Sequence, residues 1–312
     1  MKKGKNLYLY FILKIDLIVF KWKSINYALI KRNLSSRISS FPFLSPDTYL
    51  CLTDFGITNT NQLQDWLINY NKFLGKDIYI VSKLIEELNK IISTIDSKTK
   101  FNSLIIGQDD ILITSSKVSN IIPYFSAVYS SNLSESVNSI TPVPLGLERA
   151  AYKSSGIIRH FERKFSIDPQ KRIWDVVVCW NDQTNSNRFN LKNKFRDREN
   201  ILVIDKRISS YTLHKIYRKT LFVPSPAGNG LDCHRTWEAL YLGAVPVVLE
   251  SEFTGDDSWP VVRVNSWEDF LSLKHDELIN LYEKNARTQE QMIDFSLNIL
   301  EKISGKKLRA VL

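Results

Sequence analysis

The sequence predicts an α/β protein built on parallel sheets. After the first forty residues, short apolar runs typical of strands alternate with segments that show helical spacing of apolar residues. Residues 221–249 form the clearest example, because a strand, a glycine-bearing loop, a helix and a second apolar strand follow one another without a break. A length of 312 residues exceeds the usual size of one domain, so we expect two.

The first half of the chain supplies the elements of one domain. Serine and proline residues at 35–46 predict a loop, and alternation of apolar residues predicts the strands and helices that follow. We expect strands at 49–53, 77–81, 103–114, 121–129 and 140–145, and helices at 61–73 and 82–94. The run at 103–114 is interrupted by Asp109 and Asp110, which favours a turn between two apolar pieces.

The second half alternates more regularly. We expect strands at 175–180, 201–204, 221–223, 244–249 and 261–264, helices at 188–198, 211–218 and 232–242, and mostly helical structure at 276–303. The polar stretch before the first of these strands predicts a connection between the two domains that contains one helix. The expected division is an N-terminal domain at 1–148, a connection at 149–172 and a C-terminal domain at 173–312.

The loop at 225–230 has the composition of a phosphate-binding loop. Gly228 and Gly230 lack a Cβ, so the backbone can adopt positive φ and a ligand can approach closely. Asp232 is expected to cap the helix that follows. The first N–H groups of a helix have no intrahelical partner and carry partial positive charge, which suits a diphosphate. The alternative is a turn with no ligand.

Three chemically useful side chains follow within one helical turn. At about 100° per residue, His234, Arg235 and Glu238 fall on one arc of the helix. An imidazole and a guanidinium near the helix start can hold phosphate oxygens, and a carboxylate one turn later can accept hydrogen bonds from ribose hydroxyls. The alternative is a surface ion pair between Arg235 and Glu238.

The run SPAGNGLDCHRTWEALYLGAVPVV at 225–248 resembles the C-terminal motif of exostosin-like glycosyltransferases. Weaker similarity to the same family extends over most of residues 43–270, at the segments 43–54, 110–114, 141–147 and 175–188. The resemblance implies the GT-B architecture, in which two Rossmann-like domains face each other across a cleft, here followed by a long C-terminal helical segment. Two departures stand out: Ser115 and Ser116 replace an expected His-Asn pair, and Ala227 replaces a basic residue.

The resemblance also implies a donor and an acceptor. The donor is a nucleotide-sugar, expected to be a UDP-sugar, and the acceptor is a glycan or glycolipid in surface polysaccharide synthesis. The implied donor-binding residues are Arg188, Ser225, Gly228, Asn229, Gly230, Asp232, His234, Arg235 and Glu238. Arg188 is expected to clamp the diphosphate bidentately, and Arg235 and Glu238 are also expected to take part in catalysis.

Transfer to a hydroxyl requires a base, and we predict Asp109 for this role. Asp110, Asp47 and Glu148 are the alternatives, whereas His160 and His214 read as ordinary histidines. No pattern of metal ligands is visible, so no bound metal is expected. Two rival functions stay open: a non-catalytic partner subunit that binds nucleotide or glycan, and an epimerase-like enzyme, which the absence of an N-terminal GxGxxG disfavours.

The distribution of charge and the cysteine pattern limit the cellular location and the binding partners that we expect for the protein. Residues 1–37 contain nine basic residues and one acidic residue, so this segment carries nearly all of the net charge of +9. Its apolar residues and lysines suit an anionic membrane surface, although the apolar stretch can equally start the N-terminal core. Nucleic acid is not expected as a partner, because no reader motif accompanies the charge. Cys51, Cys179 and Cys233 form no pairable pattern, which indicates a reducing cytoplasm.

Overall fold

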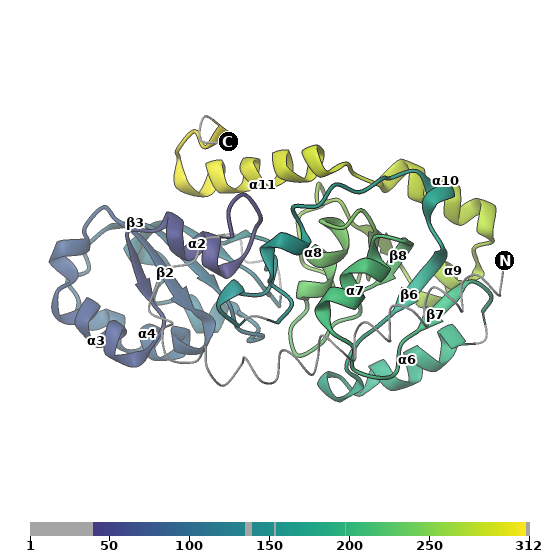
Figure 1. Ribbon diagram of the computed structural model, residues 1–312. Coiled ribbons are helices and arrows are strands. Elements are labelled where there is room, and N and C mark those ends of the chain that lie inside the picture. The colour runs from purple at the N-terminus through teal and green to yellow at the C-terminus, as the bar shows by residue number, and fades with distance from the viewer. Residues whose placement is uncertain (1–39, 135–138, 153, 197, 310–312) are drawn as a thin grey trace, which may run out of the picture.

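The computed structural model describes residues 40–134, 139–152, 154–196 and 198–309 (Figure 1). These residues form two five-stranded sheets in which every pairing is parallel, and helices connect most of the strands. The predicted α/β class with parallel sheets is therefore confirmed. The predictions for residues 1–37 lie outside the described residues.

The N-terminal sheet follows the order of the chain. Its strands lie in the order β1 (Phe55–Ile57), β2 (Asp77–Val81), β3 (Phe101–Gly107), β4 (Phe125–Ser130) and β5 (Thr141–Pro142). The accompanying helices are α2 (Pro46–Leu52), α3 (Thr60–Ile68), α4 (Ile85–Ile91) and α5 (Ser115–Val118). β2 is buried at all five positions, as expected of a strand in a parallel sheet covered on both faces.

One predicted strand of this half is wrong, and another is shorter than predicted. The residues expected as a strand at 49–53 belong to α2, because the Ser45 hydroxyl accepts a hydrogen bond from Thr48 N and Pro46 occupies the first helical turn. The second half of the predicted run at 103–114 forms only an isolated bridge between Ile113 and Leu133. The strand itself ends at Gly107, before the aspartate pair.

The C-terminal sheet reverses its strand order. Its strands are β6 (Trp174–Val178), β7 (Ile201–Val203), β8 (Thr220–Pro224), β9 (Val245–Leu249) and β10 (Val262–Val264), in the order β10-β9-β8-β6-β7. The helices are α6 (Asn187–Arg196), α7 (Ser210–Tyr217), α8 (His234–Leu240), α9 (Trp267–Ser272) and α10 (His275–Asn285). The order reverses between β6 and β8, so the loops that follow these two strands diverge and leave a crevice at the carboxyl edge.

The segment between the sheets contains short 3₁₀ turns instead of the predicted helix. These turns are η5 (Ala150–Tyr152), η6 (Ile158–His160) and η7 (Pro169–Lys171). Arg172 anchors the end of the segment by donating hydrogen bonds to the carbonyls of Tyr217, Thr220 and Gly243. Backbone carbonyls of the C-terminal half thus hold the end of the connection in place through the Arg172 side chain.

The last helix, α11 (Gln289–Ser304), returns to the N-terminal sheet. In Figure 1 it runs along the top of the molecule, from the C-terminal half to the N-terminal half. Met292 is buried in the core of the C-terminal half, whereas Leu300 and Ile303 are buried in the core beneath the N-terminal sheet. The structure therefore confirms the expectation that a terminal helix packs back across the N-terminal half.

Helix length and hydropathy bear on membrane insertion. Within the part of the chain that the structure describes, no helix has the length and apolar character needed to cross a bilayer.

We predict that Leu300→Ala destabilises the whole protein. Leu300 is fully buried, and emptying such a site costs about 2–5 kcal/mol. The exposed neighbour Lys302 provides the control, because Lys302→Ala should change stability by less than about 0.5 kcal/mol. Urea denaturation of both variants checks the prediction. Equal midpoints would mean that α11 contributes little to the N-terminal core.

Candidate functional site

A polar cavity of about 260 Å³ opens where the two halves of the chain meet. Its walls come from the loop after β6, the loop after β8, the first turns of α8, the helix α7 and the loop after β3. We call it the switch-point cavity, because β6 and β8 are the strands between which the sheet order reverses. The residues that matter for its chemistry are Asp110, Tyr217, Asn229, His234, Arg235 and Glu238.

Arg235 presents an incompletely paired charge to this cavity. Its Nε donates to Cys179 O at 2.8 Å, which fixes the guanidinium against the end of β6. Its Nη1 is buried without a well-formed hydrogen bond, and the buried Tyr217 hydroxyl, which interacts with the guanidinium, has no other partner. Burial opposes the charge, but Tyr217, the two nearby cysteines and Glu238 outweigh it and raise the pKa of Arg235 above its ordinary value. A charged donor buried without a well-formed hydrogen bond is costly, which makes Arg235 a strong candidate for binding an anion.

His234 lies on the same turn with a defined tautomer. Its Nδ1 is 2.8 Å from the carbonyl oxygen of Gly146, and a carbonyl only accepts, so Nδ1 carries the hydrogen. In the neutral ring Nε2 offers a lone pair to a ligand, whereas in the protonated ring it donates a hydrogen bond. Contact of this imidazole with phosphate oxygens therefore stays a prediction. Gly146 has φ +74°, and a Cβ there would lie 2.2 Å from Leu44 O, so only glycine fits this carbonyl's position.

Glu238 lines the cavity as an ionised carboxylate. Its side chain is buried, and burial raises its pKa, but His214, His234 and Ser155 outweigh this effect and lower it below the ordinary value. The imidazole of His214, which is charged only when protonated, places its Nε2 3.8 Å from Oε2. The alternative pairing with Arg235 on the helix surface does not occur among the ion pairs of the described residues.

The two glycines of the loop are required for contacts within the protein. Neither has positive φ, so that part of the prediction is wrong. A Cβ on Gly228 would lie 2.9 Å from Arg188 Nη2, and one on Gly230 would lie 2.7 Å from Asn132 Oδ1. The close approach predicted for a ligand is therefore made by an arginine of the C-terminal half and an asparagine of the N-terminal half.

Ser225 and Asp232 are also used internally. The Ser225 hydroxyl is buried and bonded to Thr236 Oγ1 at 2.8 Å. Asp232 does not cap α8, whose N-cap is Cys233 and lacks a side-chain cap. Its carboxylate accepts instead from Leu145 N at 2.7 Å and from Trp237 Nε1 at 2.9 Å. Neither residue lines the switch-point cavity, so both predicted ligand contacts are corrected.

Arg188 supports the loop rather than clamping a diphosphate. Its guanidinium is buried and donates to Ala227 O at 2.9 Å, Pro226 O at 2.6 Å and Thr184 Oγ1 at 2.6 Å. Two longer contacts, to Asn181 O and Cys233 Sγ, use the remaining N–H groups. Burial, followed by repulsion from Arg235, lowers the pKa of Arg188 from its ordinary value. Arg188 also lines the switch-point cavity, so its contact with a phosphate stays a prediction, although its present hydrogen bonds leave no N–H group for a bidentate clamp.

Of the predicted bases, Asp110 reaches the cavity and Asp109 does not. Asp110 is exposed, lines the cavity and accepts a hydrogen bond from Asn229 Nδ2 at 3.1 Å. Asp109 turns away and accepts from Lys83 N at 3.1 Å. Asp47 pairs with Arg149 at 2.7 Å, and Glu148 accepts from Ser155 N at 2.8 Å, so both hold backbone near the connection.

Sequence reasoning missed several residues of this site. Asn132 bonds Asp232 N through Oδ1 at 2.7 Å, and Cys179 and Tyr217 surround Arg235. His214 approaches Glu238 from behind the cavity. None of these residues belongs to the motif at 225–248. Only their place at the ends of predicted strands and helices could have identified them as residues of the site.

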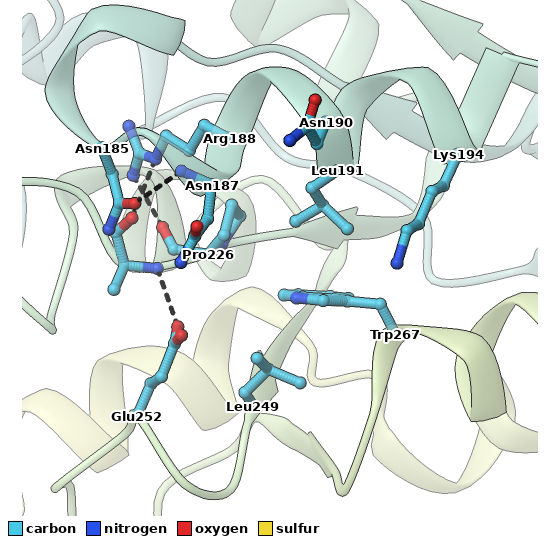
Figure 2. Close-up of a pocket in the computed structure, with 11 residues that line it drawn as sticks. Asn185, Asn187, Arg188, Asn190, Leu191, Lys194, Pro226, Leu249, Glu252 and Trp267 are labelled. Carbon is cyan, nitrogen blue, oxygen red and sulfur yellow. Dashed lines mark hydrogen bonds between the residues drawn. The ribbon is translucent and has the colours of Figure 1, made fainter.

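A second cavity of about 250 Å³ lies on the other face of the same loop (Figure 2). Figure 2 shows side chains of α6 pointing towards Trp267, with Leu249 and Glu252 on the opposite wall. Glu252 Oε2 accepts a long hydrogen bond from Ala227 N at 3.4 Å. Among the described residues, no lining side chain here has a buried polar atom without a partner. We therefore place the candidate site in the switch-point cavity.

Within the described ranges, no group of three or more histidine, cysteine, aspartate or glutamate side chains is placed to hold a metal ion. None of the three cysteines forms a disulfide, and burial raises the pKa of Cys179 and of Cys233, so both are thiols near neutral pH. No protein-family model matches the chain, and no curated protein matches it significantly.

We predict that Asp232 makes stability depend on pH. Burial raises the pKa of Asp232 to about 6 from the ordinary 3.8, so the folded state binds this proton more tightly than the unfolded state. The resulting stabilisation is complete below about pH 4 and is lost as the pH rises through about 6, a change of about 2–3 kcal/mol.

Asp232→Asn tests this by removing the titrating group. The variant should be less stable overall, because an amide cannot accept both the Leu145 and the Trp237 hydrogen bonds. Its unfolding free energy should nevertheless vary less than that of the wild type between about pH 4 and pH 7. Urea denaturation at both pH values measures this, and identical pH slopes in the two proteins would contradict the assignment.

Proposed function

We propose that the protein is a glycosyltransferase of the exostosin-like GT-B type that uses a nucleotide-sugar, with a UDP-sugar as the expected donor. The observation that carries the proposal is Arg235, a charged side chain with a buried Nη1 that lacks a well-formed hydrogen bond, beside a cavity at the carboxyl edge of a doubly wound parallel sheet. Such edges are where α/β proteins bind nucleotides. A diphosphate supplies the negative charge and acceptor oxygens that Arg235 and Tyr217 lack.

The remaining cavity residues suit the rest of a nucleotide donor. Glu238 is ionised and can accept hydrogen bonds from two ribose hydroxyls. Asn229 is exposed on the loop and can bond the diphosphate or the sugar. Three further residues support donor binding indirectly, by holding the loop and α8 in place: Ser225, Asp232 and Arg188.

Residues from both halves of the chain take part in the proposed transfer step. The acceptor hydroxyl oxygen forms a bond to the anomeric carbon of the sugar, and the bond from that carbon to the diphosphate oxygen breaks. Arg235 stabilises the negative charge that develops on the leaving nucleoside diphosphate. Asp110, across the cavity from α8, receives the proton of the acceptor hydroxyl.

The acceptor we propose is a glycan or lipid-linked glycan. Residues 1–37 carry the basic charge that would hold the enzyme at an anionic membrane surface. Release of protein from anionic vesicles after deletion of these residues would support this part of the proposal, and unchanged vesicle binding would refute it.

We predict that Arg235→Ala weakens nucleotide binding by at least about tenfold, because hydrogen bonds to charged groups contribute roughly 1.5–3 kcal/mol. Because the substitution also removes the hydrogen bond to Cys179 O, thermal melts must first show that the variant is folded. Calorimetric titration with UDP measures the effect, with Arg196→Ala as the control at an exposed arginine. Equal affinity in wild type and Arg235→Ala would overturn the assigned role.

We predict that Asp110→Asn lowers kcat by about 10²–10⁴ and leaves UDP affinity within a few fold. Asp109→Asn is the matched control, because Asp109 bonds Lys83 N and does not line the cavity. UDP release with and without acceptor glycans provides the assay. Binding of UDP by the wild type without turnover on any acceptor would favour the rival function, a non-catalytic nucleotide-binding subunit.

A further inference from the structure

Two histidines stand behind Glu238, outside the switch-point cavity. His214 belongs to α7 and is 1% exposed, so its imidazole lies in the core between α7, α8 and the connecting segment. His160 ends the 3₁₀ turn η6 of that segment and is half-buried. Their rings meet edge to face with centroids 5.0 Å apart, and Phe161 packs on His214 at 4.8 Å.

The hydrogen bond between the two rings permits only one proton. His160 Nδ1 and His214 Nδ1 are 2.9 Å apart, so one nitrogen donates and the other accepts. His214 Nε2 is buried without a hydrogen-bond partner, and the Glu238 carboxylate lies 3.8 Å from it. A lone pair on Nε2 would face this negative charge and be repelled, whereas an N–H would be attracted. In the neutral pair, the proton between the rings therefore belongs to His160, and His214 carries its hydrogen on Nε2.

We propose that His214 is a positioning residue for Glu238, and that His160 fixes the tautomer in which His214 directs an N–H at that carboxylate. The inference deepens the proposed function, because Glu238 is the group assigned there to the ribose. A carboxylate attracted from behind by an imidazole N–H keeps its orientation and its negative charge, and both favour acceptance of ribose hydroxyls. The titratable or charged groups near the pair include Glu238 and His234 on α8 and Arg218, which donates to His160 O.

Binding measurements test the role of each donor. His214→Phe retains the ring volume and removes the N–H, and we expect UDP affinity to fall about tenfold, the typical effect of losing one hydrogen bond to a charged group. His214→Gln places an amide N–H near the position of Nε2 and should recover most of this loss. His160→Asn keeps a donor to His214 Nδ1 and should bind UDP better than His160→Asp, which accepts and so forces the opposite tautomer. Equal affinities within either pair would overturn the proposal.

The control is His275, a half-exposed histidine that bonds Asp175 on the far side of the C-terminal sheet. His275→Phe should leave UDP affinity unchanged, and a loss matching that of His214→Phe would mean that replacing any imidazole has this effect. Thermal melts of all variants identify those that fail to fold, and the two conservative variants keep the test informative if His214→Phe is one of them.

Nitrogen-15 NMR tests the tautomer without any ligand. The chain has four histidines, so single variants assign each imidazole. We expect His214 to be protonated at Nε2 and unprotonated at Nδ1, and we expect Glu238→Gln to shift its Nε2 resonance. The opposite tautomer would refute the inference even if UDP binds. Failure of UDP to bind the wild type would refute the proposed function, while the NMR result would still decide whether His214 faces Glu238 with an N–H.

Discussion

The buried carboxylate of Asp232 is the interaction on which the arrangement of the site depends. It accepts hydrogen bonds from Leu145 in the first half of the chain and from Trp237 on α8, and its own N–H donates to Asn132. The start of α8 is therefore fixed by the N-terminal half, because its N-cap residue supplies no side-chain bond. This contact therefore sets the positions of His234, Arg235 and Glu238. As a result, the site exists only when both halves of the chain are folded together.

Arg188 and Arg235 both lie near the cavity, and the sequence predicted that both bind the diphosphate. In the structure the two side chains have different partners. Arg188 donates hydrogen bonds to the loop carbonyls, and its guanidinium fills the space that a Cβ on Gly228 would need. Arg235 has one bond to Cys179 O and keeps a buried nitrogen without a well-formed hydrogen bond. Burial of this guanidinium costs desolvation free energy, which Tyr217, Glu238 and the two neighbouring cysteines offset. The anionic ligand proposed above would be a further partner for it.

The sequence predicted the fold well where burial controls the pattern. Strands of a parallel sheet are covered on both faces, so β2, β6, β8 and β9 read as continuous apolar runs that no surface helix would show. Prediction failed at α2, where the capping pair Ser45 and Pro46 outweighs the strand-like run after it. It also failed in the connection, whose shape depends on distant carbonyls that bind Arg172.

The site could be located from the motif, but its internal roles could not. Spacing on one helix brought His234, Arg235 and Glu238 together, and all three line the cavity. The partners of Ser225, Gly230 and Asp232 are Thr236, Asn132 and Leu145, and two of these three lie in the other half of the chain. Local spacing contains no information about such contacts. For the same reason Asp109 and Asp110 could not be told apart, because only the fold decides which of the two turns towards α8.

The path of α11 has a consequence for biosynthesis. A ribosome releases the N-terminal sheet before α11, yet Leu300 and Ile303 of that helix complete the apolar layer beneath the sheet. Until those residues emerge, the early sheet lacks the apolar cover that they provide, a condition that invites chaperone binding. Its final compaction must therefore await the synthesis of α11, although its strands pair in simple sequential order.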